Sequence, residues 1–119
     1  VMDSLPIAIS IFAGDPPRLI GQNRAEREML RLGRPEDRPD RLIESQSRFQ
    51  VRFEDGTPLT EENSPVLETI RTGDSAGPFQ LRVTRTDGSE VRTRTYCAPV
   101  LDATGTVIGA VVTSEPIDP

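Results

Sequence analysis

The stretch FQLRVTRTDGSEVRTRTYC, residues 79–97, decides the fold because apolar and polar residues alternate on both sides of one turn. Such alternation predicts two antiparallel strands, each with one buried and one exposed face. A two-residue loop at Asp87-Gly88 would place the apolar residues of the first strand beside the arginines of the second. A three-residue loop, Asp87-Gly88-Ser89, shifts the pairing by one residue and reverses the facing of one strand. We therefore predict the three-residue loop, with Gly88 left-handed.

This register assigns the residues of both strands to faces. The inner face is predicted to hold Phe79, Leu81, Val83, Val91, Thr93, Thr95 and Cys97, and the outer face Gln80, Arg82, Thr84, Arg92, Arg94 and Tyr96. Adjacent strand residues point to opposite faces, so Tyr96 and Cys97, the only tyrosine and cysteine, cannot form a catalytic pair. Cys97 is interpreted as a small buried hydrophobe, and redox sensing or a ligand contact is the alternative.

The rest of the chain supplies further strands and helices. The segment 33–57 is polar and Arg-rich, and short helices or loops are expected there. Asn23 with Glu26 fits a capping box, and Ser64-Pro65 fits a helix start. We predict strands over 6–12, 18–21, 78–86, 90–100 and 106–114, and helices over 24–32 and 64–73.

Composition excludes several kinds of chemistry. The 119 residues predict a single domain, and the absence of His removes Ser-His-Asp or Cys-His catalysis and His-ligated metals. One Cys allows neither an intrachain disulfide nor a structural zinc site, and it fits a reducing cytoplasm. The net charge of −5, with all 14 basic residues Arg, is unsuited to nucleic-acid binding. We expect no catalytic residue, no metal, no signal peptide and no membrane span in this segment.

Several motifs, taken in order, resemble a PAS domain, a sensory module of bacterial signalling proteins. LPIAISIF and LIGQNRAEREMLRLG are similar to the strand-Asn-helix passage of that family. DGTPLTEENSPVLETIRTGD resembles its Pro-led helix ending in Thr-Gly. The segment RVTRTDGSEVRTRTYCAPVLDATGTVIGAVVTSEPID resembles its closing hairpins, so the resemblance covers essentially the full 119 residues.

The resemblance implies an α+β fold, in which a five-stranded antiparallel sheet carries helices on one face and a ligand pocket lies between them. It implies a cytoplasmic sensor of signal transduction, such as a two-component system, that biases an attached kinase, cyclase, phosphatase or regulator and forms a homodimer. Residues 1–119 are accordingly expected to be one module of a longer protein. The alternative is a ligand-free protein–protein dimerisation module.

The family's cofactor signatures were checked against this sequence. The flavin-mononucleotide branch has an Asn-Cys-Arg-Phe-type helix motif, whereas the single Cys here is on a strand, and Thr93 and Thr95 stand where that branch has an Asn and an aromatic. The haem branch needs a helical His and the flavin-redox branch usually has a Trp, and the sequence contains neither residue. We therefore expect neither haem nor flavin, and instead an unknown small organic ligand.

The predicted ligand-binding residues share an inward direction. Thr93 and Thr95 would orient a polar group of the ligand, or they would only bond to backbone or to each other across a filled core. Arg48 or Arg52 would clamp a ligand carboxylate. The full predicted set is Ile9, Ile11, Phe53, Val66, Leu67, Ile70, Leu81, Val83, Thr93, Thr95, Cys97 and Val111.

A second apolar surface is predicted on the outer face of the first and last strands. The last strand is apolar on both faces, which indicates that something covers its outer side. We expect a dimer or output surface there, formed by Ala8, Phe12, Ile108, Ala110 and Val112.

Overall fold

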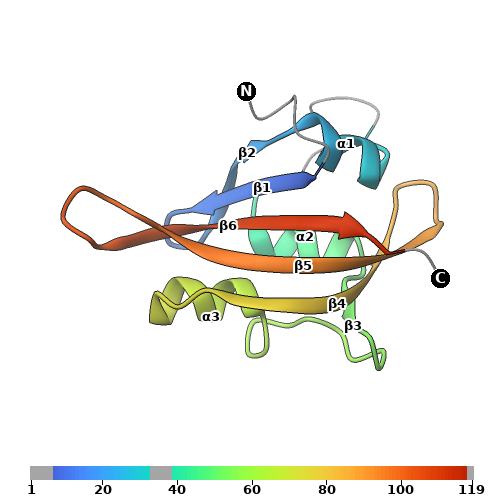
Figure 1. Cartoon of the computed structure of the whole chain (residues 1–119). Helices are drawn as coiled ribbons and strands as arrows, with labels where there is room; N and C mark the ends of the chain where they lie inside the picture. The colour runs from blue at the N-terminus through green and yellow to red at the C-terminus, as the bar shows by residue number, and fades with distance from the viewer. Residues whose placement is uncertain (1–6, 33–38, 118–119) are drawn as a thin grey trace.

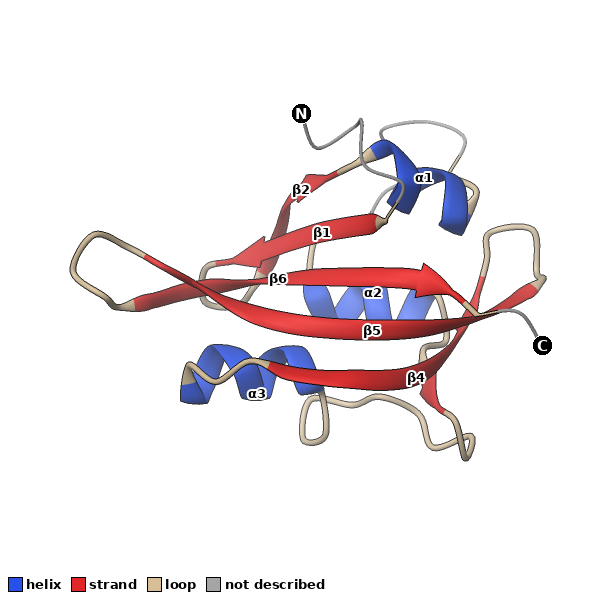
Figure 2. Ribbon diagram, viewed as in Figure 1, coloured by secondary structure: helices blue, strands red, loops and turns tan. Residues whose placement is uncertain are grey.

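The computed structural model describes residues 7–32 and 39–117 and forms one antiparallel sheet with helices on one face (Figure 1). The strand order is β2-β1-β6-β5-β4-β3. In Figure 2, α2 lies behind the central strands β5 and β6. The elements are β1 (Ala8–Ala13), β2 (Arg18–Gln22), α1 (Arg24–Leu30), α2 (Leu42–Arg48), β3 (Arg52–Phe53), α3 (Pro65–Thr72), β4 (Ala76–Thr84), β5 (Glu90–Leu101) and β6 (Val107–Pro116).

The α+β class and the five predicted strands are confirmed. The sheet has one more strand than predicted, because the two residues of β3 pair with the edge of β4. Helix α2 lies within the Arg-rich segment, for which short helices or loops were expected. The Ser64 cap of α3 is confirmed, with its side chain accepting a hydrogen bond from the amide of Leu67, and Gly73 ends the helix with φ 78°.

The predicted facing of the β4–β5 hairpin is confirmed. Leu81 lies opposite Thr93 and Val83 opposite Val91, so these side chains share one face. The loop has three residues, but it begins one residue earlier than predicted, since the amide of Arg85 bonds to the carbonyl of Ser89. The reason is Thr86, which is held in the loop by donating its amide hydrogen to the carbonyl of Leu30 at the end of α1. Gly88 is left-handed, as predicted.

The predicted facing of β1 and β6 is wrong. Cys97 lies opposite Val112, and Val112 lies opposite Ser10, so these three residues share the inner face. The same register places Ala8, Phe12 and Ala110 on the inner face, where they are buried, and Ile9, Ile11 and Val111 on the outer face. Because both faces of these strands are apolar, periodicity alone could not choose between the two registers. Ile108 is 44% exposed, in keeping with the surface position predicted for it.

Two groups of buried side chains form the core between the sheet and the helices. The first is Phe12, Leu19, Leu42, Val66, Cys97 and Ala110, and the second is Leu30, Phe49, Val83 and Val91. Asn23 fixes α1 to the first strand, because its Oδ1 accepts from the amides of Ile9 and Glu26 and its Nδ2 donates to the carbonyl of Ile7. This fully buried side chain is therefore both a helix cap and a link to the sheet.

Candidate functional site

A cavity of about 90 Å³ lies between the two core groups. Its floor is the inner face of the sheet, and its roof comes from α1, α2, the segment between α2 and α3, and the first turn of α3. Most of its wall is apolar, which is the usual character of a small-molecule site. The polar side chains in the wall are Ser10, Glu26, Ser45, Gln46, Thr93, Thr95 and Ser114.

Three hydroxyl side chains form a row on the cavity floor. Thr93 Oγ1 lies 2.9 Å from Thr95 Oγ1, which lies 3.1 Å from Ser114 Oγ. All three residues are buried. The sequence left two alternatives for these threonines, that they bond to each other or that they line a ligand cavity. The structure shows both, because they bond to each other and also line the cavity. We call Thr93, Thr95 and Ser114 the hydroxyl row.

Gln46 of α2 brings an incompletely bonded amide to the cavity wall. The residue is 6% exposed, and its Oε1 accepts a hydrogen bond of 2.6 Å from Ser64 Oγ. Its Nε2 is buried without a hydrogen-bond partner among the residues that the structure describes. A buried amide group without a hydrogen-bond partner costs free energy. This position is therefore suited to a ligand that presents a hydrogen-bond acceptor to Nε2. Sequence reasoning missed Gln46 because it did not predict where α2 begins and ends, or which of its residues face the core.

Glu26 of α1 is the carboxylic acid in the cavity wall. The predicted capping box is only half formed, since the amide of Asn23 donates to the carbonyl of Ile9 instead of to Glu26. Loss of hydration raises the pKa of Glu26 from 4.5 to about 7. Sequence reasoning assigned this carboxylate a capping role and so missed its place in the cavity.

Cys97 and Tyr96 lie on opposite faces of β5, as predicted. Cys97 is 2% exposed and lines the cavity, whereas Tyr96 is 45% exposed on the outer face. Burial raises the pKa of the Cys97 thiol to about 11, so at neutral pH it is a protonated, poorly nucleophilic group.

The predicted ligand-binding set divides into three groups. Val66, Leu81, Val83, Thr93, Thr95 and Cys97 line the cavity. Leu67 and Ile70 pack against the core beside it, and Phe53 borders a separate groove. The inward positions predicted for Ile9, Ile11 and Val111 are wrong, because the β1–β6 register turns them outward.

Neither arginine of the predicted carboxylate clamp reaches the cavity. Arg48 Nη2 lies 2.6 Å from Glu44 Oε1 on the exposed side of α2. Arg52 lies opposite Arg82, on the outer face of the sheet. The described residues that line the cavity accordingly include no cation, and the clamp prediction is wrong on geometric grounds.

A second, more open groove of about 340 Å³ adjoins the cavity. Pro65 and Phe79 line both hollows, so these two side chains form the boundary between them. The groove carries two carboxylates, Glu62 and Glu68. The amide oxygen of Asn63, also in the groove wall, accepts from the amide of Thr60 and fixes the preceding turn.

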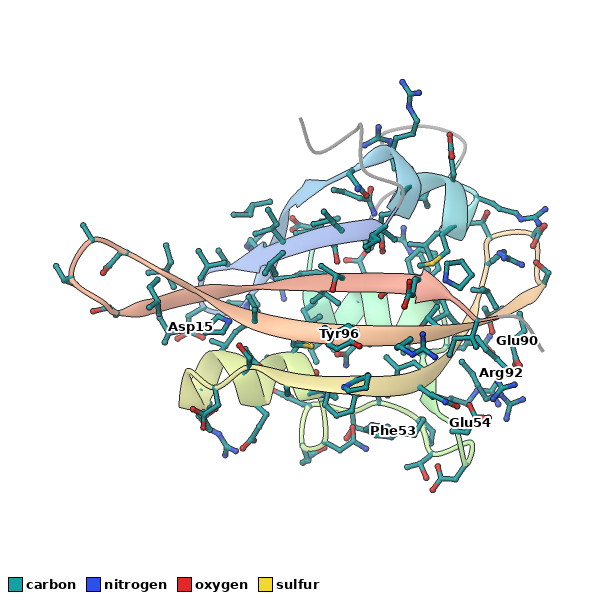
Figure 3. All side chains as sticks on the ribbon, in the orientation of Figure 1. Asp15, Phe53, Glu54, Glu90, Arg92 and Tyr96 are labelled. Atoms are coloured by element: carbon teal, nitrogen blue, oxygen red, sulfur yellow. The ribbon has the colours of Figure 1, made fainter. Side chains whose placement is uncertain are left out.

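The outer face of the sheet carries several ion pairs. Arg92 pairs with Glu54, and both lie at the same end of the molecule (Figure 3). Arg82 and Glu90 approach to 3.1 Å, as do Arg94 and Glu115. All of these side chains are at least one-third exposed, so each pair contributes little to stability.

Comparison with known proteins identifies the fold. No family model matches the chain, and no curated protein matches it. Solved structures do match. The PAS domain of a protein from Colwellia psychrerythraea aligns with 98% of this chain and 90% of its own, with TM-score 0.65 and 14% identity. The chain therefore has the fold of a PAS domain.

Two further matches are light-sensing proteins of the same fold. The LOV domain of a blue-light activated histidine kinase from Erythrobacter litoralis EL346 aligns with 97% of this chain and 99% of its own, with TM-score 0.67 and 19% identity. An RNA-binding light-oxygen-voltage receptor aligns with 97% of this chain, with TM-score 0.72 and 17% identity. This chain spans 30% of that receptor chain.

The expectation that flavin is unlikely is contradicted by the solved structures that this chain resembles. A light-oxygen-voltage structure described with a flavin analogue aligns with 94% of this chain, with TM-score 0.64 and 15% identity. A structure of this fold is thus described with a flavin analogue, so the fold itself does not exclude a flavin. The residues that line the cavity fit a flavin ring in part: the walls are apolar and Gln46 offers a donor, but no described lining residue is a cation that could meet a phosphate.

Two further observations bear on the predicted absence of spans and metals. No helix within residues 7–32 and 39–117 is long and apolar enough to cross a membrane. In those same ranges, no three His, Cys, Asp or Glu side chains are grouped so that they could hold a metal ion.

Proposed function

We propose that this chain is a cytoplasmic sensory domain that binds a small organic ligand in the cavity and thereby biases an attached effector. Catalysis would lie in that effector, which one structural neighbour, a histidine kinase, exemplifies. Support comes from the PAS fold together with a cavity whose wall is mostly apolar and carries a few polar groups.

The observation that carries the proposal is the Gln46 amide. A filled, purely structural core leaves few buried polar atoms without a partner. Here the partnerless Nε2 belongs to a residue of the cavity wall, so a ligand acceptor would complete its hydrogen bonding.

Gln46 also offers a route by which occupancy would reach the rest of the domain. Its Oε1 is bonded to Ser64 Oγ, and Ser64 caps α3. Helix α3 packs on β5 and β6. A ligand that moves the Gln46 amide would change the cap of α3, and the orientation of α3 on the sheet would carry the signal.

The test is thermal unfolding of the whole chain against a panel of metabolites and cofactors, flavins included. A ligand that binds the folded state should raise the melting temperature with concentration. Val83→Phe, which fills the cavity, should abolish this rise, whereas Val111→Phe on the outer face should retain it. The proposal is overturned if no compound stabilises the wild type, or if both variants respond like the wild type.

A homodimer is a second proposal, supported by the outer face of β1 and β6. Ile11 and Val111 lie opposite each other there, and Tyr96 of β5 is exposed on the same face. A second copy of the chain would cover this patch. Sedimentation equilibrium should show a dimer that Ile11→Asp dissociates into folded monomers, and a wild-type monomer at high concentration would reject the idea.

A further inference from the structure

We propose that the cavity takes an uncharged or cationic ring compound that presents a carbonyl oxygen to Gln46, and that it rejects anions. This inference rests on the proposed function, since it names the ligand class of the same site. Two observations support it: hydrogen-bond donors in the cavity wall have no partner, and the charged side chains around the cavity are acidic.

The Gln46 amide is held in one orientation by its neighbours. Ser64 Oγ accepts from the amide of Leu67 at 3.4 Å and lies 2.6 Å from Gln46 Oε1. Donation of the hydroxyl hydrogen to Oε1 satisfies Ser64 in both directions. The two Nε2 hydrogens of Gln46 then remain for an acceptor that the described residues do not supply.

The hydroxyl row supplies another donor on the opposite wall. Its three hydroxyls have three hydrogens, but only two bonds link Thr93, Thr95 and Ser114. One hydrogen therefore stays free to turn toward a ligand. Roof and floor both offer donors, so a ring with more than one acceptor, such as a carbonyl-bearing heterocycle, matches the site better than a hydrocarbon.

The charges exclude an anionic ligand. Glu26 and Cys97 are the titratable groups among the described lining residues, and neither becomes positive. The adjoining groove adds the carboxylate of Glu62 and that of Glu68, which is paired with Arg71, and the chain has a net charge of −5. An anion would lose its hydration here without gaining a cationic partner among the described lining residues, which is unfavourable. A neutral ring avoids that cost, and a cationic ring would pair with Glu26.

The shape of the site favours a ring that enters from the groove. The lining of the cavity includes apolar side chains from its roof, Leu30 and Phe49, and from β4, Leu81 and Val83. Pro65 and Phe79, shared by cavity and groove, stand at the passage between them. The volume of about 90 Å³ is below the roughly 150 Å³ of an engineered cavity that holds benzene. Binding therefore includes an outward movement of side chains at this passage.

The experiment compares matched pairs that differ by a negative charge: benzamide with benzoate, nicotinamide with nicotinate, uracil with orotate, and riboflavin with flavin mononucleotide. Affinities for the whole chain are measured by calorimetry, and the side-chain amide of Gln46 is followed in a nitrogen–proton correlation spectrum. We expect the neutral member of each binding pair to bind at least about tenfold more tightly. We also expect it to shift the Gln46 amide signals.

Two substitutions of the same kind provide the controls. Gln46→Met removes the donor and should weaken the best neutral ligand by about tenfold. Gln80→Met makes the same change on the exposed outer face and should leave affinity unchanged. Circular dichroism of both variants separates a lost contact from a lost fold, and if Gln46→Met is unfolded, the Gln46 amide shift in the wild type decides.

The outcomes distinguish failure of this inference from failure of the proposed function. Tighter binding of the anionic members, or neutral binding that leaves the Gln46 amide unmoved, overturns this inference while the proposed function stands. Failure of the four pairs and of the wider panel to bind at all overturns both. Neutral preference together with Gln46 dependence supports both.

Discussion

The two faces of β5 share one backbone yet differ in chemistry. Thr93, Thr95 and Cys97 point into the helix-covered interior and are at most 3% exposed. Arg92 and Arg94, which alternate with them, point outward and pair with carboxylates. Burial of one large apolar side chain contributes about 1.5–3 kcal/mol, whereas an exposed ion pair contributes about 0.2–1 kcal/mol. The inner face therefore contributes most of the stability, and the outer face tolerates change.

The largest expected effect compares two adjacent residues of β6. Ala110 is fully buried on the inner face, and Val111 is half-buried on the outer face. Ala110→Asp should cost more than about 4 kcal/mol, because it buries an unpaired charge. Val111→Asp should leave a cooperatively folding domain. Urea titrations of both variants decide this, and a larger loss for Val111→Asp than for Ala110→Asp would mean that the facing of β6 is inverted.

The next effect is the change of stability with pH that Glu26, in the cavity wall, is expected to cause. The pKa of Glu26 is 4.5 before burial and about 7 in the fold, so the folded chain binds the extra proton between these values. The free energy of unfolding should therefore fall as pH rises from about 4.5 to about 7, by at most about 3 kcal/mol in total, and then level off. Glu26→Gln should remove this slope, and denaturation at a series of pH values measures it.

Two carboxylates in the hairpin loops, Asp87 and Asp102, give the opposite slope at lower pH. Hydrogen bonds from Ser89 lower the pKa of Asp87, and those from Thr104 lower the pKa of Asp102. Their contribution to stability is lost as pH falls through these lowered pKa values. A Glu26→Gln variant that retained the full decrease in stability above pH 4.5 would show that another group causes it.

A smaller effect is expected from the hydroxyl row. Thr95→Val removes both bonds of the central hydroxyl and leaves Thr93 and Ser114 without those partners. We expect a loss of about 1–3 kcal/mol. Thr113→Val, the same change on the outer face of β6, should cost little. Thermal unfolding compares the two, and indistinguishable melting temperatures would contradict the role given to the row.

The smallest effect is expected from the outer ion pairs. Arg92→Ala breaks the pair with Glu54 and should cost less than about 1 kcal/mol. High salt should reduce even that difference, because exposed charges are screened. A double-mutant cycle with Glu54→Ala measures the pair directly. A coupling of several kcal/mol would mean that the outer face contributes to stability as much as the inner face.

The contrast between these faces also explains what the sequence could predict. Arginines on alternate positions of β5 distinguish its faces, so the sequence predicts the facing of Thr93, Thr95 and Cys97. Both faces of β6 are apolar, so a one-residue error there reversed Ala110 and Val111. The alternation of residues along a strand therefore predicts which side chains face inward only where the two faces differ in polarity.

The polar side chains of the cavity could not be predicted from the sequence, for a different reason. Glu26 fits a capping box by spacing, but the amide it would cap is taken by Ile9 of β1, a contact that only the tertiary structure shows. Gln46 lies in a seven-residue helix within a polar segment where no apolar period marks a face. The fold class, the floor of the site and the apolar Val66 of its roof were thus predictable, whereas the polar groups of the roof, Glu26 and Gln46, were not.

The most direct measurement is a nuclear Overhauser experiment on the chain bound to nicotinamide or riboflavin, whichever binds more tightly. We predict contacts from the ring protons to the methyl groups of Thr93, Thr95 and Leu81, which line the cavity. Contacts to Tyr96 or to the side chains around Arg92, with none to those methyl groups, would place the ligand on the outer face and contradict the account.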